Sequence, residues 1–565
     1  MTADTAAAWH ALAASARRRG EYLEVIDVAR QGLDEHPGDL RLEYEKTLAY
    51  ARAGATGEAE ANLRALRTAG ALEVIADPAL RNDFAALSAR LLKDRAYAAA
   101  PGTAARLATE AAAAYEAAFA ASGDYFPAIN AATLYRIAGN IGRGNALAQA
   151  ALADARAASP GYWRAATMAE AYILLGDPEA ALTALREGVA AGVHLDELAS
   201  TRRQLEWLLQ RGVGDIAVLA ALPAPYVVCW ETQTSTPEMA DTIGDLVRAQ
   251  SAGGLPVLAY GAVLGKADIE AAEAFIAVGA QVNVLLACTP ASCLETTANR
   301  FGPDWAGRLE AVLAAAARVS ELALEGDMAE PTVIAMAQQQ ARGLAAMRAT
   351  ALVTAWHMLR LGKPLVTTSP EIALPQGLRD RVARAFVFGD IKGFSTISEA
   401  AHRPFLDHVI GGFADVLATL GNAVEYTETA GDGIFVVLSG ISPALRCCDG
   451  LQRVMEPERV AAAGLPSTLA LRLGAHIGPA AIGLDRVTGR QKFIGKEVIR
   501  TARIEAVTPV GQTYVTEQFA ATLHASSAVG HACEYVGWQA MAKGFGRCRM
   551  YSLRPTPQIM ALLRD

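Results

Sequence analysis

A motif repeated at a fixed distance near the N-terminus limits the possible folds of this 565-residue chain more than any other feature. The stretches "RRGEYLEVIDVARQGLDEHP" and "RAGATGEAEANLRALRTAG" align so that Gly20 and Gly54 stand 34 residues apart. A glycine can end one helix, and small residues after it let the next helix pack closely. One such unit cannot bury its apolar face alone, so several units must stack. We therefore predict that residues 1–215 form an all-α helical repeat array.

The spacing resembles that of tetratricopeptide repeats. The stretches "RIAGNIGRGNALAQAALADA" and "LLGDPEAALTALREGVAAG" continue the pattern, and "LDELASTRRQLEWLL" (195–209) has the character of a last, capping helix. The resemblance implies a concave surface that binds a protein or peptide partner. The alternative is a helical scaffold that only packs on its neighbouring domains, and the residues favour neither interpretation.

A different pattern occupies residues 222–370. The runs "YVVCW", "LPVLAYGAVLG" and "AQVNVLLAC" are typical of strands, and "KADIEAAEAFIAVG" is typical of a helix. Strand, helix and strand within about thirty residues predict an α/β domain with a parallel sheet. The pattern resembles SLOG-type Rossmann-like domains, in which glycines in the turns after strands approach a nucleotide phosphate. Gly261 and Gly265 are the candidates for that turn.

A glycine pair alone is weak support for a nucleotide site, so we favour a structural or regulatory role for this domain. Residues 335–362 are predicted to form one or two further helices. Pro364 and "TTSPEIALPQG" are predicted to be the linker to the last domain.

An acidic residue at the end of an apolar run marks the start of the last third. In "FVFGDIKGFSTIS" (386–398) we expect a strand that ends near Asp390, a turn at Gly393 and then a helix start. Free N–H groups at a helix start favour phosphate oxygens. A carboxylate beside a phosphate needs a cation between them, most simply Mg²⁺. The alternative is that Asp390 only caps the helix.

A second acidic residue supports the metal interpretation. The stretch "NAVEYTETAGDGIFVVLSG" (422–440) has two strand-like runs around Gly431-Asp432-Gly433, which predicts a hairpin with Asp432 at its tip. If the hairpin lies beside the first strand, Asp390 and Asp432 can share metal ions. Such a pair can activate a hydroxyl and stabilise a leaving pyrophosphate.

These two stretches, followed by three more, resemble the class III nucleotidyl cyclases over residues 380–555. The later stretches are "LALRLGAHIGPAAIG", "KFIGKEVIRTARIEAV", and the pair "PVGQTYVTEQFA" and "MAKGFGRCRMYSL". The resemblance implies an α/β, ferredoxin-like fold that acts as a head-to-tail homodimer with its sites at the interface. It also implies that the 3′-hydroxyl of a nucleoside triphosphate attacks the α-phosphate, giving a 3′,5′-cyclic nucleotide and pyrophosphate.

The resemblance assigns roles to individual positions. Asp390 and Asp432, with Ile391, match the ligands of two Mg²⁺ or Mn²⁺ ions, and Arg503 matches the arginine that stabilises the transferring phosphate. The remaining substrate contacts would come from Gly393, Phe394, Ser395 and Lys543. Two positions depart from the family: Ile499 stands where an asparagine usually orients the ribose, and Phe545 stands where a lysine often meets the terminal phosphates.

The positions that select the base are also unusual. Glu428 matches the first position as in guanylyl cyclases, and Lys492 at the second matches neither class. A glutamate would accept from guanine N1–H and the 2-amino group, and a lysine would donate to O6, which favours GTP because unpaired buried polar groups discriminate strongly. ATP stays open, and an ion pair between Glu428 and Lys492 across an empty site is the other interpretation.

Two functions are therefore open for the chain. The first is a purine nucleotidyl cyclase regulated by its N-terminal domains, and the second is a degenerate cyclase-like protein that senses a nucleotide or binds a partner. The net charge of −8 and the absence of a basic stripe argue against nucleic acid as a partner. No run is long and apolar enough for a membrane span, and seven cysteines without a framework suggest reduced thiols, so a cytoplasmic location is expected.

Overall fold

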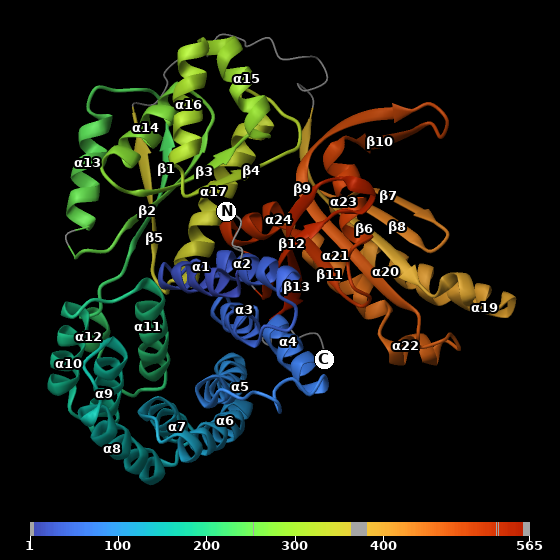
Figure 1. Ribbon diagram of the computed structural model, residues 1–565. Helices are drawn as coiled ribbons and strands as arrows, with labels where there is room; N and C mark the ends of the chain where they lie inside the picture. Colours follow the sequence, from blue (N-terminus) through green and yellow to red (C-terminus); the bar gives the residue numbers. More distant parts are fainter. Residues whose placement is uncertain (1–4, 252, 363–380, 527, 529, 557–565) are drawn as a thin grey trace.

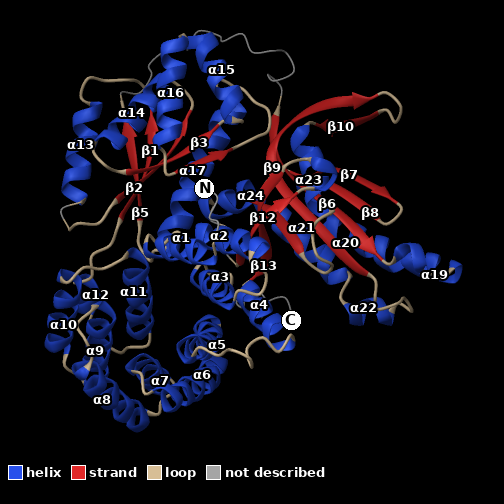
Figure 2. Ribbon diagram, in the orientation of Figure 1, coloured by secondary structure: helices blue, strands red, loops and turns tan. Residues whose placement is uncertain are grey.

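Three parts follow one another along the chain in the computed structural model (Figure 1). The structure describes residues 5–251, 253–362, 381–526, 528 and 530–556. An array of helices comes first, a parallel sheet with its helices second, and a larger, mostly antiparallel sheet third (Figure 2). In the part of the chain that is described, no helix combines the length and the apolar character needed to cross a bilayer.

The helices of the first part pack in sequence order and curl into a ring, which α11 closes by contacting α1 (Figure 1). Gly20 and Gly54 follow α1 and α3 with φ of +66° and +81°. This left-handed conformation favours glycine, so the predicted helix ends are confirmed. The predicted last helix is α11, but the short α12 follows it. The elements are α1 (Ala6–Arg18), α2 (Tyr22–Glu35), α3 (Leu40–Arg52), α4 (Thr56–Thr68), α5 (Pro78–Ala98), α6 (Pro101–Ser122), α7 (Tyr125–Ile137), α8 (Ile141–Ala157), α9 (Tyr162–Leu175), α10 (Pro178–Ala190), α11 (Leu195–Gln210) and α12 (Ile216–Ala220).

The middle part is a five-stranded sheet in the order β4-β3-β2-β1-β5, and every pair of strands is parallel, as the strand–helix–strand pattern predicts. Helices lie on the sheet between successive strands (Figure 2). The strands are β1 (Tyr226–Thr232), β2 (Val257–Val263), β3 (Gln281–Leu286), β4 (Arg318–Glu321) and β5 (Trp356–Leu361). The helices are α13 (Met239–Gln250), α14 (Lys266–Ala277), α15 (Pro290–Phe301), α16 (Pro303–Ala315) and α17 (Pro331–Ala351).

Two predictions for this part were wrong. Gly261 lies inside β2 and not in the turn after it, and a Cβ there would fall 2.1 Å from the ring of Trp230. The glycine therefore makes room for a buried tryptophan and not for a phosphate, while Gly265 does stand at the start of α14. Residues 335–362 are not all helical, because β5 follows α17 and pairs with β1. The predicted linker from Pro364 lies outside the described residues.

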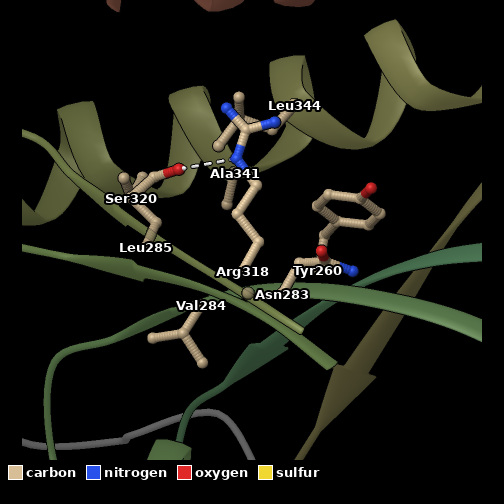
Figure 3. A pocket seen from close by; sticks show the side chains of 9 residues that line it. Tyr260, Asn283, Val284, Leu285, Arg318, Ser320, Ala341 and Leu344 are labelled. Atoms are coloured by element: carbon tan, nitrogen blue, oxygen red, sulfur yellow. Dashed lines mark hydrogen bonds between the residues drawn. The ribbon is translucent and has the colours of Figure 1, made fainter. Parts of the chain in front are cut away.

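A small pocket between this sheet and α17 shows how little free space the domain leaves there (Figure 3). The side chain of Arg318 crosses it, and its Nε donates to Ser320 Oγ at 3.3 Å. The volume is about 10 Å³. That is room for about one water molecule, not for a nucleotide.

The last part is built on one sheet in the order β12-β13-β11-β9-β6-β8-β7, with β10 paired to β9. Its core is apolar and includes Phe386, Val387, Val436 and Leu473. The strands are β6 (Val382–Lys392), β7 (Val424–Ala430), β8 (Gly433–Leu438), β9 (Ala470–Asp485), β10 (Arg490–Ile494), β11 (Thr513–Thr516), β12 (His531–Ala540) and β13 (Arg547–Pro555). The helices are α19 (Glu399–Pro404), which continues through a π-helical turn (Phe405–Ile410) into α20 (Gly411–Leu420), α21 (Ile441–Val454), α22 (Pro457–Ala462), α23 (Lys496–Glu505) and α24 (Glu517–Ala525).

The three parts pack directly on one another. α24 lies against α17 so closely that a Cβ on Gly343 would fall 1.9 Å from the carbonyl oxygen of Ala521. Tyr535 of β12 donates to Asp27 of α2 at 2.8 Å. The C-terminal sheet is therefore held by both preceding parts.

Candidate active site

The two acidic residues of the predicted metal site meet at one end of the C-terminal sheet. Asp390 of β6 lies opposite Gly433, the first residue of β8 and the neighbour of Asp432 in the chain. Gly431 turns the hairpin with φ of +62°, and Asp432 is half-buried at its tip. The predicted hairpin is confirmed, whereas the role of these carboxylates as metal ligands stays a prediction. The side chain of Ile391 is apolar and buried, so a ligand role at this position would fall to the main-chain carbonyl oxygen.

An arginine and a glutamate that sequence reasoning missed belong to the same cluster. Arg472 lies opposite Asp390 on β9 and forms an ion pair with it. The same guanidinium lies 3.1 Å from Glu505. Burial raises the pKa of Glu505 to about 7, Arg472 opposes that rise, and the Asp390 and Asp432 carboxylates add to it. Three carboxylates thus gather around one arginine.

The cluster has the charge that a divalent cation requires. One guanidinium cannot neutralise three carboxylates, and the raised pKa of Glu505 reflects burial together with that excess of negative charge. Among the described residues, no group of three or more His, Cys, Asp or Glu side chains has the geometry to hold a metal ion unaided. Asp390 and Asp432 would therefore hold an ion together with oxygens of a bound phosphate, as Mg²⁺ sites often do.

Helix α23 carries the predicted catalytic arginine, which is partly buried, beside the exposed Ile499. Arg503 and Ile499 stand four residues apart, which places them on the same side of the helix. Ile499 is 45 % exposed. Within the described residues, Nε of Arg503 has no hydrogen-bond partner although it is buried. An unpaired guanidinium N–H is suited to an anionic ligand.

The start of α23 is fixed to the middle part of the chain. The Glu497 carboxylate is buried and accepts from the backbone N–H of Leu324 at 2.7 Å. It also lies 3.0 Å from Arg500 and 2.8 Å from His476. Although burial acts to raise it, these partners lower the pKa of Glu497 to about 2. The helix that presents Arg503 is therefore anchored by a buried charge.

The predicted phosphate loop turns where expected but forms a shorter helix. Gly393 adopts φ of +93°, which confirms the turn. A single 3₁₀ turn, Phe394–Thr396, follows, and α19 begins only at Glu399. Ser395 is exposed, whereas Phe394 packs on Phe405 with ring centroids 4.6 Å apart. Phe394 therefore offers its backbone and not its ring to a ligand.

The two residues predicted to select the base lie close together. Lys492 Nζ is 3.7 Å from Glu428 Oε2, and Tyr426 donates its hydroxyl to the same oxygen at 2.9 Å. Lys492 is half-exposed and Glu428 is exposed. The ion pair foreseen for an empty site is present, and both side chains are accessible to a ligand.

The two remaining positions differ in their surroundings. Lys543 is exposed and has a left-handed backbone with φ of +59°. Phe545 packs against a small apolar cluster that includes Met541 and Met550. Of the two, only Lys543 has an exposed, charged side chain.

Comparison with protein families identifies two segments of the chain. Residues 380–555 match the model of the adenylate and guanylate cyclase catalytic domain. Residues 380–555 belong to that family. Residues 21–135 match the model named Tetratricopeptide Repeats-Sensor. The tetratricopeptide and cyclase resemblances found in the sequence are therefore confirmed for these segments, whereas the resemblance of residues 222–370 to a SLOG-type domain is not confirmed.

Solved structures similar to the chain align with the cyclase domain. One is the guanylate cyclase domain of RhGC from Catenaria anguillulae in complex with GTP, with 18% identity and a TM-score of 0.27; it covers 31% of this chain and 97% of that chain. Another is the adenylyl cyclase CyaB from P. aeruginosa, with 18% identity, a TM-score of 0.27, and 31% and 95% coverage. A third is the guanylyl cyclase Cya2, with 25% identity, a TM-score of 0.26, and 31% and 94% coverage. No curated protein sequence matches the chain.

Proposed function

We propose that the chain is a nucleotidyl cyclase that converts a purine nucleoside triphosphate into a 3′,5′-cyclic nucleotide and pyrophosphate. The observation that carries the proposal is the meeting of Asp390 and Asp432 at one end of a segment that matches the cyclase family. Asp390 comes from strand β6 and Asp432 from the turn between β7 and β8, and the fold alone gives no reason to place the two carboxylates together beside Glu505. A shared divalent cation gives that reason.

The reaction needs few protein groups. The 3′-hydroxyl oxygen forms a bond to the α-phosphorus, the bond from that phosphorus to the bridging oxygen breaks, and pyrophosphate leaves. Bound Mg²⁺ or Mn²⁺ would supply electrostatic stabilisation of the attacking hydroxyl and the phosphates. Arg503 would donate to the transferring phosphate as its charge develops, which the unpaired Nε–H supports.

The substrate proposed is GTP, with ATP as the competitor. Glu428 and Lys492 present an acceptor and a donor side by side, which complements guanine N1–H, its 2-amino group and O6. Adenine has an acceptor at N1, which would face the carboxylate. Because the two side chains already pair with each other, a base must exchange that ion pair for its own hydrogen bonds.

A homodimer is part of the proposal. Four large apolar side chains between residues 484 and 499 are exposed: Leu484 at 69 %, Val487 at 95 %, Ile494 at 54 % and Ile499 at 45 %. They lie on the extended β9–β10 arm and on α23, next to Arg503. Exposed apolar side chains gathered in one region are typical of an interaction surface.

Mixing two inactive variants tests the reaction and the interface together. Asp390→Ala and Arg503→Ala should each lower turnover at least about 100-fold. If one chain supplies the carboxylates and its partner supplies the arginine, half of the randomly formed dimers regain one site. The mixture should then recover about a quarter of the wild-type activity. Recovery of none would refute the shared site, and full activity in either single variant would refute the proposed reaction.

A second function is favoured by one pair of observations. Ile499 cannot orient a ribose, and Phe545 is packed into an apolar cluster instead of facing a phosphate. A cyclase-like domain that binds a nucleotide or a partner without turnover fits both. It would bind GTP with unchanged affinity in the Arg503→Ala variant and form no product in any variant.

A further inference from the structure

The ring of N-terminal helices surrounds a sizeable cavity. Its volume is about 690 Å³, within the range of about 300–1,000 Å³ that small-molecule sites occupy. Because α11 contacts α1, the walls come from both ends of the array (Figure 1). A space this size, walled by helices on all sides of the ring, suits a small molecule and not a folded partner.

Two helices bring their polar faces together in this cavity. On α5, Arg90, Lys93 and Tyr97 line it at helical spacing. On α11, the lining residues include Arg203 and Trp207. The faces touch where the rings of Tyr97 and Trp207 lie 5.5 Å apart between centroids. The two rings, called the aromatic ledge below, therefore lie one helical turn, about 5 Å along each helix, from the cations Lys93 and Arg203.

Two of the positive charges in this region have no direct ion-pair partner. Arg90 pairs with Asp94 at 3.5 Å. Lys93 Nζ instead donates to amide oxygens, Asn130 Oδ1 at 2.7 Å and Gln204 Oε1 at 3.3 Å. Arg203 donates only a long bond of 3.5 Å to a backbone carbonyl. The lining also contains carboxylates, among them Glu170, which accepts from Gln204 at 2.7 Å. Among the described residues, however, neither Lys93 nor Arg203 has a carboxylate within ion-pair distance.

The pKa values of Lys93 and Arg203 are both lowered. Burial lowers the pKa of Lys93 to about 8, and Arg90 and Arg203 lower it further, whereas Asp94 and Glu170 oppose the change. Burial and the charge of Arg90 also lower the pKa of Arg203. Mutual repulsion of buried cations is unfavourable unless an anion binds between them. Burial and the neighbouring arginines thus favour the neutral form of Lys93, and a bound anion would favour its charged form.

One hydrogen-bond donor is also left free. Trp207 is 2 % exposed, yet its indole N–H has no hydrogen-bond partner among the described residues. A buried donor of this kind is normally satisfied, so its lack of a partner needs a reason. The Trp207 side chain lines the cavity. An acceptor brought by a ligand would satisfy this N–H.

We propose that this cavity is a binding site for a small anion whose phosphate or carboxylate group is attached to a planar ring. The anionic group lies between Lys93 and Arg203, and the ring lies against Tyr97 and Trp207. Charge-assisted hydrogen bonds fix the anion, and the aromatic ledge excludes water from the ring. The site is separate from the cyclase residues, so binding is measurable whether or not the protein turns over a nucleotide.

Four probes separate the parts of this ligand. Guanosine 5′-monophosphate carries a ring and a phosphate, nicotinate carries a ring and a carboxylate, guanosine carries the ring alone, and inorganic phosphate carries the anion alone. Each is titrated calorimetrically into the full-length chain in EDTA. At least one of the two ring-bearing anions should bind with one-to-one stoichiometry. Guanosine and inorganic phosphate should each bind at least about tenfold more weakly. The probe with the higher affinity shows whether the site prefers a phosphate or a carboxylate.

Matched variants locate the binding. Lys93→Met and Arg203→Met should each weaken it by about tenfold to a hundredfold, since each removes one charge-assisted contact. Arg211→Met, an exposed arginine just after α11, is the control and should bind as the wild type does. If a probe bound at the cyclase site instead, its affinity would be the same in all three variants. Thermal melting shows whether each variant is folded. If one of the two cavity variants does not fold, the affinity of the other tests the proposal.

Three results would overturn the proposal. The first is no saturable binding of either ring-bearing anion at millimolar concentration. The second is guanosine binding as tightly as its monophosphate while nicotinate does not bind. The third is equal affinity in Arg203→Met, or in a folded Lys93→Met, and Arg211→Met.

Discussion

Replacing Glu497 with glutamine should loosen the helix that presents Arg503. Glutamine keeps the shape and can still accept from the Leu324 N–H, but it leaves Arg500 buried without its counter-charge. A pKa of about 2 for Glu497, against an ordinary value of 4.5, corresponds to about 3 kcal/mol of stabilisation of the charged form. The side chain is 1 % exposed, so solvent screening removes little of this. Breaking such a buried pair is costly for the same reason.

Hydrogen exchange of the α23 amides is the direct assay. A loss of about 3 kcal/mol should speed exchange over Lys496–Glu505 by about 150-fold where the helix opens locally. Glu325→Gln is the matched control, because Glu325 pairs with the neighbouring Lys496 and both side chains are at least half exposed. An exposed pair contributes at most about 1 kcal/mol. Equal exchange in the two variants would refute the anchoring role of Glu497.

The effect should depend on pH in one direction. The folded protein holds the pKa of Glu497 below its unfolded value, so the carboxylate stabilises the fold fully above about pH 4.5. That contribution declines as the pH falls toward about 2. The difference between wild type and Glu497→Gln should therefore be constant from pH 7 to about 5 and shrink below that range. A difference that grows as the pH falls would contradict the sign of the shift.

Three further predictions concern other positions. Ile499→Asn should raise turnover about tenfold or more, because it restores a group that can orient the ribose on the face of Arg503; unchanged kcat would assign the orienting role elsewhere. Glu428→Lys combined with Lys492→Asp should shift preference from GTP toward ATP by about tenfold in kcat/KM, and an unchanged ratio would remove the ion pair from base selection. Gly343→Ala should lower the free energy of unfolding by about 1–3 kcal/mol and the melting temperature by a few degrees, because the new Cβ would meet the Ala521 carbonyl. Gly307→Ala, at a helix position with open space around it, is the control and should not lower the melting temperature.

The order of elements could be read from the sequence because local signals marked most of their ends. Gly20 and Gly54 ended helices, and Gly431 turned the hairpin, each with positive φ. The end of α17 was missed because Val353 takes φ of +54° there. A β-branched residue rarely adopts that conformation, so nothing in the sequence marked the break before β5.

The site could be predicted only as far as its motifs extend. Asp390 stands near the end of a recognisable strand and Asp432 in a recognisable turn, but Arg472 and Glu505 join them through strand register and helix packing. A one-residue change of register would have turned Arg472 away from Asp390. The cavity in the ring was out of reach for the same reason, since Lys93 and Arg203 meet only after the array curls.

Product analysis by mass spectrometry tests the central proposal most directly. The purified chain is incubated separately with ATP, GTP, CTP and UTP in Mn²⁺, and Asp390→Ala is treated in parallel. We expect a cyclic purine nucleotide and pyrophosphate from the wild type, with GTP preferred, and no product from the variant. No cyclic product from any of the four triphosphates, or the same product from Asp390→Ala, would contradict the proposed cyclase.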